Sequence, residues 1–361
     1  MVGKGRVLMA MSGGVDSSVT AILLREQGYE LVGITMKTWD YASSGVSPKE
    51  TGCCSLDSIN DARSVAVKFD FPHYILDLRK EFEEKIISNF ISEYIMGRTP
   101  NPCALCNKLV KWDYLLKKAD QLNCEFIATG HYSQVIFENG RYFLRKGLDE
   151  SKDQTYVLWG LSQEHLKRTL FPLGNYRKTD IKAMAKGFGI PRLANKRESY
   201  EICFIPDNDY RSFLKNRVEG LEQRVDGGNF VLSDGKIFGK HHGYPFYTIG
   251  QRKGLEVAVG HPLYVKSIDA ANNLVELGVK DELLKLELVA DGLNLMKYTD
   301  FSRLEHITTK IRYKDSGAGS VLTKLGDTVH VVFDKAVSAI TPGQSAVFYD
   351  GLDVVGGGII I

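Results

Sequence analysis

The feature that most limits what this chain can fold into is a glycine-rich turn near its N-terminus. The apolar run Arg6–Ala10 leads into MSGGVDSS at 11–18, and apolar residues then recur at helical spacing as far as Gln27. Two adjacent glycines without Cβ atoms let backbone N–H groups close around an anion, and the serines and the positive helix N-terminus add to that attraction. The pattern predicts a phosphate-binding strand–loop–helix unit.

The rest of the first half repeats the alternation of strand and helix, which predicts a doubly wound parallel sheet of the α/β class. Strands are expected at Arg6–Ala10, Tyr29–Met36, His73–Leu78 and Phe126–Thr129. Apolar residues recur at helical spacing in Val15–Gln27, Leu56–Phe69, Glu81–Met96 and Lys108–Leu122. Helical patterns resume later and continue to about Phe188. Between Gln134 and Gly147, two alternating runs around a Glu-Asn-Gly turn predict a hairpin attached to this domain.

The pattern of secondary structure predicted from the sequence changes twice after this region. The chain has 361 residues, which is enough for more than one domain. One short helical pattern and a Gly-rich stretch follow Pro206, and short strands separated by turns follow from about Lys266. We expect a first domain over 1–206, a small central domain over 207–265 and a C-terminal β-barrel over 266–361.

Composition narrows the functional classes. The N-terminal apolar run lacks a small-residue cleavage pattern, and no apolar run reaches the roughly 18 residues of a membrane helix, so a cytoplasmic protein without membrane contact is expected. Six cysteines are too few for a disulfide scaffold, so neighbouring ones are candidates for redox, metal or catalytic chemistry. The segment 141–197 holds 13 Lys and Arg against 5 Asp and Glu, although the whole chain carries only +2, which suits a polyanionic partner.

The loop SGGVDSS lacks the lysine of a Walker P-loop and resembles instead the PP-loop of ATP pyrophosphatases. The resemblance implies that ATP binds here and that an oxygen is adenylated with release of pyrophosphate. It makes Asp16 a ligand of the Mg²⁺ that accompanies pyrophosphate, and the serine hydroxyls contacts of phosphate oxygens. The expected ATP-binding residues are Ala10, Met11, Ser12, Gly13, Gly14, Val15, Asp16, Ser17, Ser18, Met36 and Gly130.

A second candidate site lies in GRTPNPCALCNK at 97–108. Two prolines stiffen the approach to Cys106, which lies close to the N-terminus of the predicted helix from Lys108. The helix dipole and Lys108 should favour its thiolate form. Its expected partner is Cys203, far along the chain in EICF, which only the fold can bring close.

Several motifs occur in one order along nearly the whole chain: GRTPNPCALCNK, ATGHYS, KDQTYVLWGLS, LFPLGNYRK, YEICFI, YTIGQRKGL, KIRY, TPGQSAVFYDG and GGGII. Together they resemble the tRNA-specific 2-thiouridylase (MnmA) family. The resemblance implies ATP-dependent 2-thiolation of the wobble uridine, U34, in tRNAs for Lys, Glu and Gln. The activity would be that of a tRNA-uridine 2-sulfurtransferase, with sulfur supplied by a cysteine desulfurase or a sulfur-relay protein.

The family resemblance also implies residue roles. Cys203 would carry sulfane sulfur as a persulfide, and Cys106 would attack it or assist its release, ending in a Cys106–Cys203 disulfide bond. His131 and Gly130 would lie by the nucleotide and the tRNA. The residues expected to contact tRNA are Asn101, Pro102, Cys103, His131, Lys152, Asp153, Gln154, Arg312, Tyr313 and Gln344.

One position departs from the common family pattern. Many members have Asp, a proposed general base, where this chain has Cys103. Cys103, Cys106 and Cys203 instead resemble the three-cysteine set of related thiolases that hold a [4Fe-4S] cluster. Persulfide chemistry and cluster chemistry both stay open at this point.

Two other functional classes are also open. A PP-loop synthetase could adenylate a small-molecule carbonyl, but it would not need distant paired cysteines. A nonenzymatic tRNA-binding protein would not need an intact phosphate loop with Asp16. Cys53 and Cys54 lie in a Gly-, Ser- and Pro-rich stretch that indicates a loop, and Cys124 precedes an apolar strand and is expected to be buried.

Overall fold

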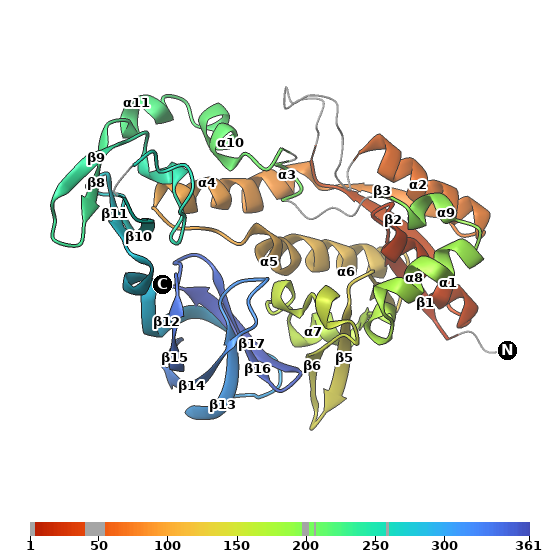
Figure 1. Cartoon of the computed structure of the whole chain (residues 1–361). Coiled ribbons are helices and arrows are strands. Elements are labelled where there is room, and N and C mark those ends of the chain that lie inside the picture. The colour runs from red at the N-terminus through yellow and green to blue at the C-terminus, as the bar shows by residue number, and fades with distance from the viewer. Residues whose placement is uncertain (1–3, 40–54, 197–201, 206, 258–259) are drawn as a thin grey trace.

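The computed structural model describes residues 4–39, 55–196, 202–205, 207–257 and 260–361. Cys53 and Cys54 lie outside these ranges. Three parts are visible in Figure 1: a sheet with its helices around β1 and α1, a second domain around β8 to β11, and a barrel built from β12 to β17.

The first domain has a five-stranded parallel sheet in the order β3-β2-β1-β4-β7. Its strands are β1 (Arg6–Ala10), β2 (Glu30–Lys37), β3 (His73–Asp77), β4 (Phe126–Ala128) and β7 (Thr169–Leu170). Val7, Leu8 and Met9 of β1 are fully buried, as a central strand covered on both faces requires. The predicted doubly wound α/β fold is confirmed.

The helices of this domain include α1 (Val15–Glu26), α2 (Leu56–Lys68), α7 (Gln163–Lys167), α8 (Lys178–Gly187) and α9 (Pro191–Ala194). The segment from Arg79 to Ile95 combines α3 (Arg79–Phe82), a π-helical turn (Glu83–Ile87) and α4 (Ser88–Ile95). The segment from Pro102 to Gln121 likewise combines α5 (Pro102–Cys106), a π-helical turn (Asn107–Lys111) and α6 (Trp112–Gln121). The predicted helices therefore exist, but the last one begins six residues earlier than predicted, at Pro102 rather than Lys108.

The predicted hairpin forms as β5 (Ser133–Glu138) and β6 (Arg141–Lys146) and contacts the first domain, where Gln163 of α7 donates to the Tyr142 carbonyl at 2.7 Å, but its pairing with another sheet was not predicted. β6 pairs with β17 of the C-terminal sheet through Arg145 and Asp353, so the hairpin extends that sheet rather than the first domain's. The Arg145 guanidinium also donates to the Asp353 carboxylate from Nη2 at 3.1 Å.

The second domain has α10 (Tyr210–Arg217), α11 (Leu221–Val225) and a four-stranded sheet in the order β10-β11-β8-β9. Its strands are β8 (Gly228–Leu232), β9 (Ile237–His241), β10 (Tyr264–Asp269) and β11 (Leu274–Gly278). The sequence placed β10 and β11 in the C-terminal domain, but β11 pairs in parallel with β8. We therefore propose that the second domain extends to Gly278 instead of ending at residue 265.

The third part is a β-barrel, as predicted. Its strands are β12 (Leu284–Leu295), β13 (Arg303–Lys310), β14 (Ala318–Leu325), β15 (Thr328–Ser338), β16 (Ser345–Asp350) and β17 (Asp353–Ile360). Pairing of β12 with β17 closes the sheet on itself, which removes the open edges of these strands.

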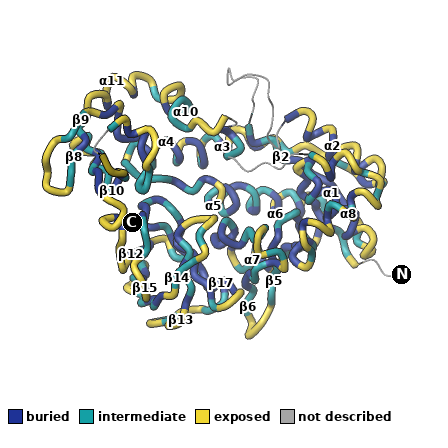
Figure 2. The backbone as a smooth tube through the Cα atoms, in the orientation of Figure 1, coloured by how far each residue is buried: buried dark blue, intermediate teal, exposed yellow. Residues whose placement is uncertain are grey.

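Buried residues lie inside each part and also where the parts meet, whereas α11 and the β8–β9 turn are largely exposed at the periphery (Figure 2). One hydrophobic cluster joins Trp112 and Leu115 of α6 to Val347 and Tyr349 of β16. Another joins α4 and α5 to the second domain. No helix in the described part of the chain is long and apolar enough to cross a membrane.

Candidate active site

The glycine-rich loop follows β1 and closes tightly against α2. Gly13 has φ +69°, and a Cβ there would lie 2.0 Å from the Ser58 carbonyl oxygen, so only glycine fits. Gly14 is the N-cap of α1 and offers no side-chain hydrogen bond to the helix. The N-terminus of α1 therefore has the form of an anion-binding helix end.

Serine side chains hold the shape of this loop. The Ser17 hydroxyl accepts from the Ser12 N–H at 3.2 Å and donates to the Gly14 carbonyl at 3.2 Å. The Ser18 hydroxyl donates to the same carbonyl at 2.9 Å. Ser12 is exposed, whereas Ser17 and Ser18 are buried.

The loop after β4 meets the glycine-rich loop from the other side. A Cβ on Gly130 would lie 2.8 Å from the Ser17 backbone nitrogen, so this glycine allows the two loops to touch. In the sheet, β1 lies between β2 and β4. The chain adds β2 and β3 on one side of β1 and β4 and β7 on the other, so the direction of winding reverses between β1 and β4. This is the place in an open parallel sheet where ligands bind. Met36, near the end of β2 at the same edge, is partly buried.

The Asp16 carboxylate accepts hydrogen bonds from two other side chains in this site. The Lys178 ammonium at the start of α8 donates to its two carboxylate oxygens at 2.7 and 2.6 Å, and the Tyr132 hydroxyl donates to Oδ1 at 2.8 Å. The Lys178 side chain is only 8% exposed, so Asp16 offsets much of the cost of burying its charge. Lys178 and Tyr132 were not among the residues predicted to form the site, although they lie in the motifs LFPLGNYRK and ATGHYS.

A second lysine reaches the loop from beyond α9. The Lys196 ammonium donates to the Gly13 carbonyl at 3.2 Å and to the Asp61 carboxylate of α2 at 2.8 Å. The loop, which has no lysine of its own, is therefore bordered by Lys178 and Lys196 from distant parts of the chain.

The donor set at Asp16 suits Mg²⁺ only together with substrate phosphates. Mg²⁺ commonly binds through one or two carboxylates plus phosphate oxygens and water. Asp16 supplies one carboxylate that is 31% exposed, and both of its oxygens also accept from Lys178. A Mg²⁺–pyrophosphate unit can therefore use Asp16 as its protein ligand.

Cys103 and Cys106 lie on α5, and their positions there differ from the sequence expectation. Asn101 caps the helix by accepting from the Ala104 N–H at 3.3 Å. Cys103 therefore occupies the first turn, whereas Cys106 lies at the end of α5 with the helix continuing beyond it. Because the dipole effect falls off within the first turn, it acts on Cys103 more than on Cys106. Lys108 places its ammonium 5.4 Å from the Trp159 ring.

Cys106 and Cys203 share one hydrophobic environment despite their distance in sequence. Cys106 is 5% exposed and belongs to the cluster that includes Phe90 and Phe204, and Cys203 packs against that cluster. Cys103, Cys106, Cys124 and Cys203 form no disulfide bond among the described residues. The Phe204 ring contacts Phe82 and Phe90 edge-on, which fixes the chain beside Cys203 to α3 and α4.

Cys103, Cys106 and Cys203 are the three cysteines expected to be available for a [4Fe-4S] cluster. In the ranges that the structure describes, no group of three His, Cys, Asp or Glu side chains could hold a metal ion. Of the two cysteines of α5, Cys103 is exposed to solvent and Cys106 is buried.

Two titratable groups respond to the same lysine, Lys111. Desolvation raises the pKa of the Cys103 thiol although the residue reaches solvent, and Lys111 opposes this change. Desolvation first, and Lys111 second, lower the pKa of His131 to about 3. The His131 ring lies 5.7 Å from Trp112 and 5.9 Å from Phe171, and its Nδ1 shares a hydrogen bond of 2.7 Å with Thr129. His131 is therefore a neutral imidazole at pH 7.

The depressed pKa of His131 predicts acid sensitivity. The unfolded chain binds a proton at this residue below pH ~6.5, whereas the folded chain does so only near pH 3. Between these values the unfolded state binds more protons, so stability falls as the pH falls. Urea unfolding of His131→Asn between pH 4 and 7 should show a shallower pH dependence, by up to about one proton. An unchanged slope would show that His131 titrates normally.

The expected tRNA-contacting residues lie at the seam between the first domain and the barrel. Gln154 accepts from the Tyr132 N–H at 3.0 Å, and Asp153 accepts from the Thr155 N–H and hydroxyl at 3.2 and 2.8 Å. Lys152 ends a short 3₁₀ turn just before them. Arg312 and Tyr313 are exposed, and the Arg312 guanidinium donates to the Ser338 carbonyl at 2.7 Å.

Gln344 contacts the loop that precedes α5 and its cysteines. Its side-chain amide donates to the carbonyls of Thr99 and Pro100 at 3.0 and 2.9 Å. Asn101, beside Pro102, donates to the Ser345 hydroxyl at 3.2 Å. The structure thus joins three of the predicted sites: Asn101 and Pro102, the α5 cysteines, and Gln344 of the barrel.

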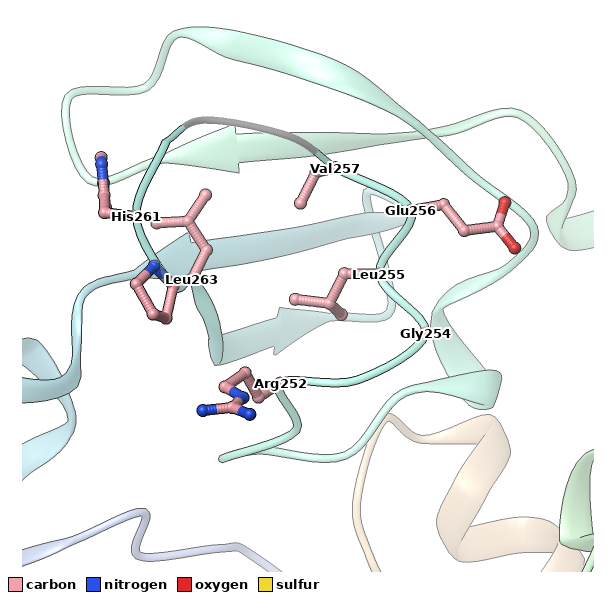
Figure 3. A pocket seen from close by; sticks show the side chains of 8 residues that line it. Arg252, Gly254, Leu255, Glu256, Val257, His261 and Leu263 are labelled. Atoms are coloured by element: carbon pink, nitrogen blue, oxygen red, sulfur yellow. The ribbon is translucent and has the colours of Figure 1, made fainter.

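A cavity of about 350 Å³ lies elsewhere, in the second domain. Arg252, Leu255, Glu256 and His261 are among its lining residues, and Figure 3 shows them spread around an open loop. Its lining includes none of the residues predicted to bind ATP, sulfur or tRNA.

Comparisons with known proteins cover the whole chain. Three family models match in succession: a tRNA methyl transferase HUP domain over 5–207, a tRNA methyl transferase PRC-barrel domain over 211–278 and an aminomethyltransferase β-barrel domain over 286–360. The chain is 61% identical over 359 residues to the tRNA-specific 2-thiouridylase MnmA of Amoebophilus asiaticus, covering 99% of this chain and 95% of the relative. It is 58% identical over 358 residues to the protein of that name from Cytophaga hutchinsonii, covering 99% and 97%.

Proposed function

Because the chain belongs to the tRNA-specific 2-thiouridylase (MnmA) family, we propose that it replaces O2 of the wobble uridine of tRNA with sulfur, using ATP. Membership makes the chain a tRNA-modifying sulfurtransferase. The position on the base, the tRNAs for Lys, Glu and Gln, and the route of sulfur belong to the proposal. The observation that carries it is the packing of Cys106 and Cys203 in one cluster of a chain that also has an anion-binding loop at Asp16.

In the first half of the reaction, ATP activates the base. Uridine O2 attacks the α-phosphorus, the bond to the bridging oxygen breaks, and pyrophosphate leaves. The N-terminus of α1, Lys178 and Lys196 border the place where the negative charge of pyrophosphate develops. Mg²⁺ held by Asp16 would neutralise phosphate charge. The neutral His131 can donate or accept a hydrogen bond beside the base without adding charge.

In the second half, sulfur displaces AMP. The terminal sulfur of a Cys203 persulfide attacks C2 of the activated uridine, and AMP leaves with the O2 oxygen. The Cys106 thiolate then attacks the Sγ of Cys203, and the electron pair of the breaking S–S bond passes to the new thiocarbonyl. Cys106 and Cys203 end as a disulfide, which two electrons from an external thiol reductant reopen before the next cycle. A desulfurase or a relay protein would reload Cys203.

Pyrophosphate release separates this proposal from the two other classes. We expect release from ATP to depend on both magnesium and a substrate tRNA. A small-molecule synthetase would release pyrophosphate with its own acceptor and without tRNA, and a nonenzymatic tRNA-binding protein would release none. Either result would contradict the proposed function.

The tRNA interface includes two further lysines at the seam, Lys146 of β6 and Lys310 of β13. The Lys146 ammonium lies 4.5 Å from the Tyr349 ring of β16. Lys310 lies opposite Val347, also of β16, in the pairing of β13 with β16. Desolvation lowers the pKa of Lys310, Asp153 opposes this change and Lys146 adds to it. Within the described residues neither lysine has an ion pair within 4.0 Å, so an RNA phosphate is the anion that we expect between them.

This assignment predicts a change in salt dependence. Each lost phosphate contact should reduce the slope of log affinity against log salt by about 0.7 to 0.9. Filter binding of tRNA over a salt series should therefore show lower slopes for Lys146→Ala and Lys310→Ala. Lys324→Ala is the matched control, because Lys324 of β14 is already paired with Asp300 at 2.6 Å. Slopes equal to that of the control would argue against a phosphate at this seam.

A further inference from the structure

The loop that precedes the α5 cysteines is held by the barrel. The Thr99 N–H donates to the Pro342 carbonyl at 2.9 Å, and the Gln344 amide donates to the carbonyls of Thr99 and Pro100 at 3.0 and 2.9 Å. A primary amide has two N–H donors, and the two carbonyls use both. The segment Thr341–Ser345, which we term the latch, therefore binds backbone groups of the loop, two of them through the Gln344 side chain.

Close packing reinforces these hydrogen bonds. Gly343 has φ +91°, and a Cβ there would lie 2.7 Å from the Thr99 carbonyl oxygen, so the latch approaches the loop as closely as its backbone allows. On the opposite side, a Cβ on Gly97 would lie 3.0 Å from Ile268 of β10. The loop is thus confined between the barrel and the second domain.

The latch also reaches the helix cap. Ser345 is fully buried, and its hydroxyl accepts from Asn101 at 3.2 Å and from the Trp159 indole at 2.9 Å. Asn101 in turn caps α5 by accepting from the Ala104 N–H. A continuous hydrogen-bonded path therefore runs from β16 of the barrel to the first turn of the helix that carries Cys103 and Cys106.

We propose that Gln344 and Ser345 are positioning residues: they fix the start of α5, and thereby keep Cys106 buried in the hydrophobic cluster against which Cys203 packs. This inference rests on the proposed function for its catalytic consequence. It differs from the direct tRNA contact that the family resemblance implies for Gln344, because here the side-chain donors are used on the protein's own loop. Docking of tRNA on the barrel would then act on the cysteines through the latch.

The test compares Gln344→Glu and Ser345→Ala with the wild type. Glutamate has almost the shape of glutamine but places an anionic acceptor against the two carbonyls, and alanine removes the hydroxyl that Asn101 and Trp159 share. The first readout is alkylation of the free protein by iodoacetamide, followed residue by residue by mass spectrometry. It needs neither tRNA nor activity, so it stands even if the wild type fails to thiolate tRNA.

In the wild type, the exposed Cys103 should react and the buried Cys106 should be protected. Loss of the latch should raise the alkylation rate of Cys106 about tenfold, the effect expected from losing one or two hydrogen bonds. Cys124 is the internal control, because it is 3% exposed in a different cluster that includes Trp112. A parallel rise at Cys124 would show general loosening and would overturn the proposal, as would an unchanged rate at Cys106.

The second readout separates positioning from tRNA contact. If the latch positions the cysteines, the variants should thiolate with kcat lowered about tenfold and with the KM for tRNA within about twofold of the wild type. A raised KM with an unchanged kcat would mean that Gln344 binds tRNA directly and would refute the latch. A wild type that forms no thiouridine would refute the proposed function, while the alkylation result would still decide the proposal.

Discussion

Replacing either Cys106 or Cys203 with serine should abolish 2-thiouridine formation while leaving pyrophosphate release from ATP and tRNA largely intact. A hydroxyl neither carries sulfane sulfur nor attacks a disulfide sulfur. Cys203→Ser should therefore stop after adenylation, whereas Cys106→Ser should stop with the tRNA held on Cys203 through a disulfide bond. Both substitutions are nearly isosteric, and the two side chains lie in or against one hydrophobic cluster, so folding should be retained. Nucleoside mass spectrometry of the tRNA, beside a pyrophosphate assay, measures the two halves separately.

Two other cysteines provide the controls for this experiment. Cys124→Ser, buried in a different cluster, should thiolate normally. Cys103→Asp restores the carboxylate found in many family members and removes a ligand that a three-cysteine cluster would need. On the two-cysteine route it should remain active and the wild type should hold no iron. Activity that follows iron content and disappears in Cys103→Asp would contradict the persulfide step.

Asp16→Ala should abolish adenylation with little change in tRNA affinity. The variant loses the carboxylate expected to hold Mg²⁺, and it takes away the anion beside the Lys178 ammonium, whose side chain is 8% exposed. Removing one member of a buried charge pair is strongly unfavourable, and we expect the rate of tRNA-dependent pyrophosphate release to fall by about a thousandfold or more. The tRNA-binding residues lie on other elements, so filter binding should change by less than about threefold.

A matched control is Asp70, which follows α2 and contacts the far end of α1. The Asp70 carboxylate pairs with Arg25 in the last turn of α1, and the Asp70 side chain is 99% exposed. Because an exposed ion pair contributes little, Asp70→Ala should leave adenylation unchanged. Pyrophosphate release by Asp16→Ala at the wild-type rate would show that this loop does not hold the reacting phosphates.

Local chemistry made the nucleotide loop predictable. Gly13, Gly14 and Asp16 follow a short strand in sequence, and β1 and α1 form within one residue of the expected bounds. What the local pattern does not contain is the charge that completes the loop. Lys178 and Tyr132 meet Asp16 only because α8 and the segment after β4 fold over the start of α1.

The predictions that failed concerned where a helix begins and which strands pair. The start of α5 at Pro102 depends on the Asn101 cap, so Cys103 rather than Cys106 takes the first turn. The attachment of the β5–β6 hairpin to β17, and of β11 to β8, depends on long-range pairing that alternation within a strand does not specify. The role of Gln344 depends in the same way on contact with a loop 244 and 245 residues away.

Thiolation of tRNA by the purified protein is the most direct test of the central claim. The wild type is incubated with ATP, Mg²⁺, a tRNA for Lys, Glu or Gln, a cysteine desulfurase and ³⁴S-labelled cysteine, and the nucleosides are then analysed by mass spectrometry. The account predicts ³⁴S-labelled 2-thiouridine at the wobble position, with one AMP and one pyrophosphate formed for each thio group. ATP cleavage that leaves the wobble uridine unlabelled, or labelling that needs no ATP, would contradict it.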